Sequence, residues 1–193
     1  MAKGGLSDAL TTAGIAVAPG VRWADEMRLG LRGVTRKVWA PRGVKVVQQQ
    51  ELRYDWRYLA LAVDGLGGTL AWTWIPNMKS ATLAPIVAGW QDAGFPGVVW
   101  DGAASHRGRA VRDLGFPLVV QPPAAPELNP AERVFEYLRG EVEGRPYATL
   151  TDKMAKVDSV LQQLVAAPDR IRALAGPAWI RAALNPRKNT ILS

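Results

Sequence analysis

Residues 21–31 read VRWADEMRLGL, and their side chains alternate in character. This period of two is typical of a β-strand. One side of the strand is apolar except for an acid, Asp25, and the adjacent Glu26 is expected to face the other way. A carboxylate on an apolar face needs a metal, a cation or hydrogen bonds. Asp25 is therefore a candidate functional residue.

The segments that follow predict a mixed sheet. Two strands joined by a glycine-rich turn at Asp64 precede a helix, a strand, a short helix, a strand, a proline-rich turn and another helix. This order predicts an α/β fold of the ribonuclease H-like type, with a mixed sheet flanked by helices and a helical C-terminal extension. The predicted elements are strands at 58–63, 69–75, 97–100 and 118–121, and helices at 80–93 and 105–114.

The chain is long enough for one ordinary domain with its own core. We expect a flexible N-terminal segment over residues 1–20 and a catalytic domain over residues 21–148. Helices over residues 149–184 are expected to pack on that domain, followed by a basic tail over residues 185–193.

Composition limits the chemistry. The absence of cysteine excludes disulfides and zinc-thiolate sites, and one histidine excludes a histidine-rich metal site. Any metal ligands are then mostly carboxylates, which favours Mg²⁺ or Mn²⁺. A net charge of +7 and a pI near 10 favour nucleic acid as a partner, although many basic proteins bind none. With no signal-peptide pattern or membrane-spanning stretch, we expect a cytoplasmic protein.

Three acidic stretches, residues 23–26 (WADE), 99–106 (VWDGAASH) and 126–135 (PELNPAERVF), occur in this order. Together they resemble the motifs of DDE superfamily transposases from the bacterial insertion-sequence branch of the mariner superfamily. The resemblance covers residues 21–164, and the third motif is the most specific. Gly102 and Phe135 depart from the usual asparagine and tryptophan, and the gap between the second and third acids is short.

The resemblance implies that Asp25, Asp101 and Glu132 are catalytic residues that bind two Mg²⁺ or Mn²⁺ ions. Two such ions activate the nucleophile and stabilise the leaving oxygen in phosphodiester transfer. We expect His106 and Asn129 to support this site.

Each acid also has a structural interpretation. Asn129 and Glu132 occupy the N-cap and N3 positions of a predicted helix, so Glu132 could complete a capping box. Asp101 could cap the turn that follows it, and Asp25 could pair with an arginine. Other acids could be mistaken for members of the site, namely Glu136 above all, then Asp64 and Glu127.

Two basic clusters are candidates for contact with the DNA backbone, although solvated charge is the simpler interpretation. They consist of Arg32, Arg36, Lys37 and Arg42 after the first strand, and of Arg107 and Arg109 near Asp101. Trp23, Trp72, Trp74 and Trp100 lie in predicted strands and are expected in the core rather than stacked on bases.

The leading hypothesis is metal-dependent DNA strand cleavage and strand transfer. The implied partners are transposon ends, target DNA and a second copy of the chain. No helix-turn-helix region precedes the catalytic motifs, so a separate DNA-binding chain or domain is a further expected partner. Two alternatives stay open: a non-catalytic DNA-binding remnant, and another ribonuclease H-like nuclease.

Overall fold

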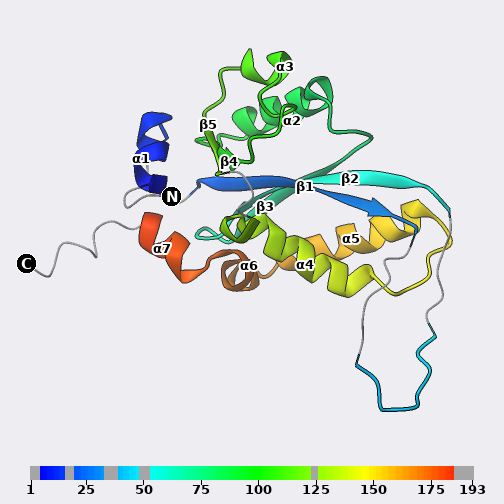
Figure 1. Cartoon of the computed structure of the whole chain (residues 1–193). Coiled ribbons are helices and arrows are strands. Elements are labelled where there is room, and N and C mark those ends of the chain that lie inside the picture. Colours follow the sequence, from blue (N-terminus) through cyan, green and yellow to red (C-terminus); the bar gives the residue numbers. More distant parts are fainter. Residues whose placement is uncertain (1–4, 16–19, 33–38, 48–52, 123–125, 185–193) are drawn as a thin grey trace, which may run out of the picture.

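Five strands form one mixed sheet in the order β3-β2-β1-β4-β5 (Figure 1). The computed structural model describes residues 5–15, 20–32, 39–47, 53–122 and 126–184. Strand β2 is antiparallel to both β1 and β3, whereas β4 is parallel to both β1 and β5. The bounds are β1 Arg22–Gly30, β2 Trp56–Asp64, β3 Thr69–Ile75, β4 Val98–Trp100 and β5 Leu118–Val120. The predicted mixed sheet is confirmed.

Helices cover both faces of the sheet (Figure 1). One face carries α4 (Pro130–Val142), α5 (Leu150–Val165) and α6 (Pro168–Ala175), with the 3₁₀ turn η1 (Pro126–Leu128) leading into α4. The other face carries α2 (Ser80–Asp92) and α3 (Arg109–Arg112). The predicted C-terminal helices are thus present, followed by α7 (Ala178–Leu184).

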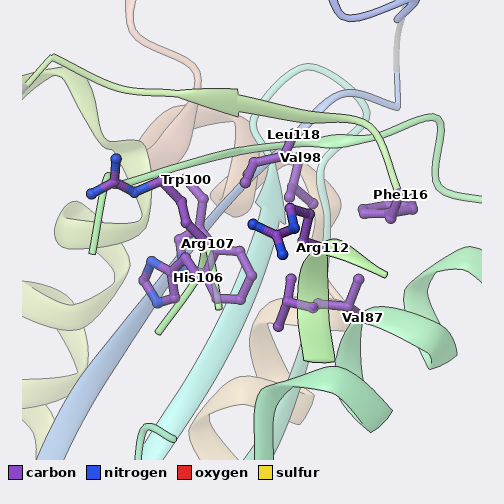
Figure 2. A pocket seen from close by; sticks show the side chains of 9 residues that line it. Val87, Val98, Trp100, His106, Arg107, Arg112, Phe116 and Leu118 are labelled. Atoms are coloured by element: carbon purple, nitrogen blue, oxygen red, sulfur yellow. The ribbon is translucent and has the colours of Figure 1, made fainter. Parts of the chain in front are cut away.

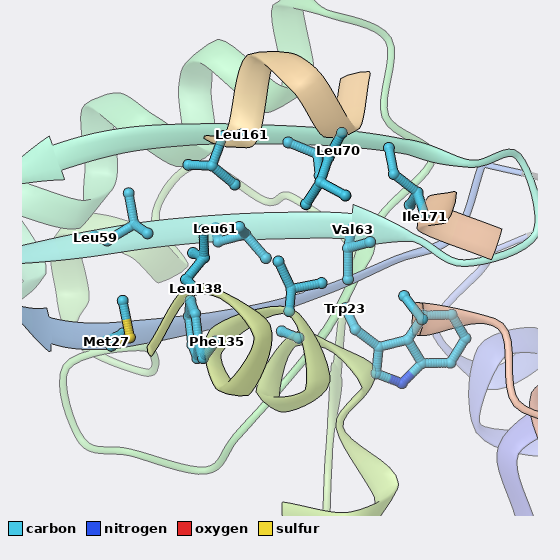
Figure 3. Packing of buried hydrophobic residues seen from close by; sticks show 14 of the residues in the cluster. Trp23, Met27, Leu59, Leu61, Val63, Leu70, Phe135, Leu138, Leu161 and Ile171 are labelled. Carbon is cyan, nitrogen blue, oxygen red and sulfur yellow. The ribbon is translucent and has the colours of Figure 1, made fainter. Parts of the chain in front are cut away.

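The main core lies between the sheet and α4 to α6 (Figure 3). Trp23 and Met27 of β1 point into it beside Phe135 and Leu138 of α4, and all four side chains are buried. A second cluster faces α2, where small residues of β1 and β2, such as Ala24, Ala60 and Ala62, leave room for the helix. Asp25 is therefore the acid that projects from β1 on the α4 side of the sheet.

The tryptophans predicted to be structural lie in the two clusters. Trp23 and Trp100 are fully buried. Trp72 and Trp74 of β3 pack against the main cluster and donate their indole N–H groups to Asp158 of α5, at 2.8 and 2.9 Å. These contacts fasten α5 to the outer strand of the sheet.

The N-terminal expectation needs a correction for residues 5–15. They form the helix α1 (Gly5–Thr12) and the turn after it, and Leu6, Leu10 and Ile15 are buried in the main core. This apolar spacing fixes the segment onto the domain. The predicted basic tail lies outside the described residues. Within the described ranges, no helix is both long and apolar enough to cross a membrane.

The helix predicted at 105–114 is shorter in the structure. Only Arg109–Arg112 is helical, because the backbone of Gly108 is extended and residues 104–107 form turns. A Cβ atom at Gly108 would lie 2.4 Å from the Ser80 hydroxyl, so α2 approaches the chain closely there. The turns that replace the first part of the helix place His106 in the protein interior.

Candidate active site

Asp25 lies at the point where β1 and β4 separate. The parallel pairing of Trp23 with Val99 is the last along these strands, and β4 ends at Trp100. Continuing this register brings Asp25 alongside Asp101, the first residue of the following loop. Parallel strands commonly place functional groups at such an edge.

The Asp25 carboxylate is held by two hydrogen bonds. Its Oδ1 accepts the backbone N–H of Glu26 at 2.8 Å, and its Oδ2 accepts the side-chain amide of Asn129 at 2.9 Å. Asn129 also caps α4 by accepting the Ala131 N–H at 3.0 Å. The Asn129 amide also donates to the Ala24 backbone carbonyl at 3.3 Å. The predicted N-cap and the predicted neighbour of the site are therefore one side chain with three hydrogen bonds.

Burial raises the pKa of Asp25 to about 7. The hydrogen bond from Glu26 N–H lowers this pKa, whereas the negative charges of Glu26, Glu132 and Asp101 raise it further. In the described part of the chain, no lysine or arginine forms an ion pair with Asp25, so the arginine interpretation is not supported. The acids from the three motifs therefore interact electrostatically at one place.

Glu132 does not form the capping box. Its backbone N–H bonds to the Asn129 carbonyl, while its carboxylate lies 3.7 Å from the Arg139 guanidinium on the same helix. About two fifths of the Glu132 side chain is exposed. The carboxylate is thus left at the surface near Asp25, as a metal ligand would require.

Asp101 both caps its turn and contacts a buried histidine. Its Oδ1 accepts the Ala103 N–H at 2.9 Å and lies 2.5 Å from Nδ1 of His106. The other ring nitrogen, Nε2, lies 3.1 Å from Oε2 of Glu26. The His106 ring stacks on the Trp100 indole, with centroids 3.9 Å apart (Figure 2).

Burial disfavours the charged form of His106, but its neighbours outweigh this effect. The hydrogen bond to Glu26 and the charges of Glu26 and Asp101 leave the pKa of His106 above its ordinary value. Glu26 was not among the predicted site residues. The alternation of β1 placed it correctly on the opposite face, and the signal that could have found it is its parallel alignment with the loop that carries His106.

The donor set fits a hard divalent cation. Asp25, Asp101 and Glu132 supply oxygen atoms, and their mutual repulsion at Asp25 is what a cation would relieve. Among the described residues, no three acidic or histidine side chains are grouped closely enough to hold one ion as they stand. The three acids form an electrostatic cluster rather than a preformed coordination shell.

The rival acids lie elsewhere or have structural contacts. Asp64 is a buried turn residue whose Oδ1 accepts the N–H groups of Leu66 and Gly67. Glu136 and Glu127 are exposed. None of the three appears among the charges that act on Asp25.

Four predicted DNA-binding residues lie in the described ranges, namely Arg32, Arg42, Arg107 and Arg109, and all are exposed. Arg32 donates to the Tyr54 hydroxyl at 2.7 Å, and Arg109 pairs with Asp113 at 3.3 Å. Arg36 and Lys37 lie outside the described residues.

An apolar hollow of about 460 Å³ lies on the α2 side of the sheet (Figure 2). Trp100 and His106 form part of its wall, and Arg107 and Arg112 are its cationic residues. None of the three motif acids lines it. The three motif acids thus lie outside this hollow, whose wall includes the His106 ring.

Comparisons with known proteins agree with this arrangement. The family described as DDE superfamily endonuclease matches residues 20–152. No curated protein sequence matches the chain. Among solved structures, the Mos1 transposase paired-end complex with left transposon end shares 16% identity and superposes with a TM-score of 0.62, covering 91% of this chain and 60% of that one.

The Mos1 strand transfer complex has 15% identity and a TM-score of 0.63, over 92% of this chain and 58% of that one. The Mos1 mariner paired-end complex with Mn has a TM-score of 0.58 at 15% identity, over 87% and 60%. The chain therefore spans about three fifths of the length of these transposase chains. The ribonuclease H-like fold class is confirmed.

Proposed function

Because the chain belongs to the DDE superfamily endonuclease family, we propose that it cleaves DNA strands and joins them to target DNA in a reaction that depends on Mg²⁺ or Mn²⁺. One observation carries the proposal: the three motifs meet at Asp25, which aligns with Asp101 after β4, accepts a hydrogen bond from Asn129 at the start of α4, and has its pKa raised by burial and then by the charges of Glu26, Glu132 and Asp101. Asp101 caps a turn and Glu132 lies near Arg139, but no lysine or arginine among the described residues pairs with Asp25.

Asp25, Asp101 and Glu132 would hold two divalent ions. When bound, the ions activate the attacking water or 3′-hydroxyl and stabilise the leaving oxygen. Asn129 fixes one oxygen of Asp25, and the exposed Arg107 would contact backbone phosphates beside Asp101. The acids would come together around metal and DNA, because carboxylate sites for Mg²⁺ usually include substrate oxygens.

The proposed substrates are transposon ends and target DNA, bound by a homodimer. The similar structures are a Mos1 transposase paired-end complex with a transposon end, a Mos1 strand transfer complex and a Mos1 mariner paired-end complex with Mn. A helix-turn-helix chain or domain would supply end recognition. These partners are proposed for the whole active assembly, of which this chain is the catalytic part.

Nicking of supercoiled plasmid by the purified protein tests the activity. We expect nicking with Mn²⁺ or Mg²⁺ that is lost in Asp101→Asn and Glu132→Gln, with DNA binding retained in both. Glu136→Gln is the matched control, because Glu136 is an exposed acid on the same helix as Glu132 and should leave nicking unchanged. Firm DNA binding without nicking by the wild type would instead indicate a non-catalytic DNA-binding protein.

A further inference from the structure

Glu26 is a buried acid with a single side-chain partner. Its side chain is 1% exposed, Oε2 faces His106, and Oε1 has no hydrogen-bond partner in the described structure. A buried carboxylate in this state is costly, and a buried ion pair can often be replaced as a whole by apolar side chains of similar size without loss of stability. Packing alone therefore does not explain an acid at this position.

His106 connects Glu26 to Asp101. The ring is completely buried and is held flat against Trp100. Its Nε2 lies 3.1 Å from Oε2 of Glu26, and its Nδ1 lies 2.5 Å from Oδ1 of Asp101 and 3.4 Å from the Asp101 backbone carbonyl oxygen. The ring is therefore held between Glu26 and both the main chain and the side chain of Asp101.

Asp101 is otherwise weakly held. Its side chain is 52% exposed on the loop after β4, and apart from His106 its only side-chain hydrogen bond in the described ranges comes from Ala103 N–H. Both contacts use Oδ1. Within the same ranges, Oδ2 has no protein partner.

We infer that Glu26 is a positioning residue that acts on Asp101 through His106. Glu26 fixes the histidine ring, the ring fixes Oδ1 of Asp101, and Oδ2 stays available to a cation. The inference rests on the proposed function, because it takes Asp101 to be a metal ligand. Loss of such outer contacts at metal sites typically costs about 10-fold to 100-fold in metal affinity or activity.

Two substitutions separate positioning from packing. Glu26→Met keeps an unbranched side chain and removes both carboxylate oxygens. It also leaves Nε2 of His106 buried without a partner, so the domain should be less stable than the wild type, and metal binding is compared under conditions where circular dichroism shows both proteins folded. Glu26→Gln keeps an oxygen that accepts the His106 N–H and should rescue part of the function. Glu136→Gln serves as the control for loss of an acid at the surface.

Because His106 is the only histidine in the chain, its ring can be observed directly. With a histidine-free affinity tag, ¹⁵N NMR should show the Nε2 resonance of the wild type shifted in Glu26→Met and unchanged in Glu136→Gln. Unchanged ring resonances in Glu26→Met would overturn the inference.

Metal binding is measured independently of activity by titrating the protein with Mn²⁺ and measuring the concentration of free Mn²⁺ by electron paramagnetic resonance. We expect the Mn²⁺ dissociation constant of Glu26→Met to rise about tenfold or more, with a smaller rise in Glu26→Gln. In plasmid nicking, kcat should fall about tenfold in Glu26→Met, while KM for DNA stays within about twofold.

The two proposals fail in different ways. Equal Mn²⁺ affinity in Glu26→Met and the wild type would overturn the positioning role even if the wild type nicks DNA. Weaker Mn²⁺ binding in Glu26→Met, alongside a wild type that never nicks, would support the positioning role and contradict the proposed activity.

Discussion

Asp25 gains a proton at a pH where surface aspartates are ionised. Its pKa is about 7 in the fold, against 3.8 ordinarily, so between these values the folded protein holds a proton that the unfolded chain has released. Stability from this group therefore decreases as pH rises from about 4 to 7. The raised pKa of His106 acts in the same direction, because its contribution is complete below 6.5 and is lost as pH rises through the folded value.

Metal should reverse this loss. We expect the metal-free protein to melt at a lower temperature at pH 8 than at pH 5.5, and Mn²⁺ to raise the melting temperature more at pH 8, where it no longer competes with the Asp25 proton. Thermal melts of the wild type and Asp25→Ala, with and without Mn²⁺, check this. The variant should lose most of the Mn²⁺ effect and the Asp25 share of the pH effect, with the share of His106 retained, and equal stabilisation by Mn²⁺ at the two pH values would contradict the prediction.

Asn129 has an N-cap contact and amide contacts that substitution can separate. Asn129→Ser keeps an N-cap oxygen for Ala131 but loses the amide that donates to Asp25 and to the Ala24 carbonyl, so nicking should fall and stability should fall by about 1 kcal/mol. Asn129→Ala also loses the N-cap contact and should lose about a further 1 kcal/mol of stability. Denaturant unfolding and nicking assays on the two variants distinguish the roles, and full activity in Asn129→Ser would show that the Asp25 contact is dispensable.

At the scale of elements, one buried lysine connects α5 to the end of β1 and to the end of α4. Lys153 donates to the Gly30 carbonyl at the end of β1 and lies 3.4 Å from Glu143 just after α4, and its side chain is 3% exposed. Lys153→Met leaves Glu143 without its cation and should cost about 3 kcal/mol in the free energy of unfolding. Lys156→Met on the same helix is the control, and adding Glu143→Gln to Lys153→Met should recover part of the loss in urea unfolding.

The positions of helices and strands could be predicted from the sequence where buried residues recur with a regular period. The alternation around Asp25 predicted β1 nearly at its bounds, and Asn129-Pro130 predicted the start of α4. The short α3 could not be predicted, because its limit depends on the close approach of Ser80 to Gly108 across the fold. The contact of Glu26 with His106 could not be predicted either, because it depends on which loop lies opposite β1. That is a property of strand order and not of neighbouring residues.

At the scale of the whole molecule, the net charge is +7, although several acids gather around Asp25 in the candidate active site. DNA affinity should therefore be dominated by phosphate contacts and fall steeply with salt. The exposed Arg107 follows the second acidic motif in the sequence and lines the hollow beside His106.

Replacing Arg107 and Arg109 together with alanine should weaken DNA binding irrespective of sequence. It should also reduce the slope of log affinity against log salt by up to about 2. Binding isotherms at several salt concentrations measure both quantities. The charge-matched control is Lys156→Ala with Arg181→Ala on α5 and α7, and an equal effect in that control would show that general charge, not this location, determines binding.

The pleat of β1 gives two adjacent acids opposite surroundings. Asp25 faces α4 and the open acidic cluster, whereas Glu26 faces the buried histidine on the other side. Exchanging them, as Glu at 25 and Asp at 26, would leave composition, charge and strand propensity almost unchanged. The longer glutamate side chain at position 25 would then crowd the acidic cluster, and the shorter aspartate side chain at position 26 would no longer reach the His106 ring. The order of the two acids therefore matters as much as their presence.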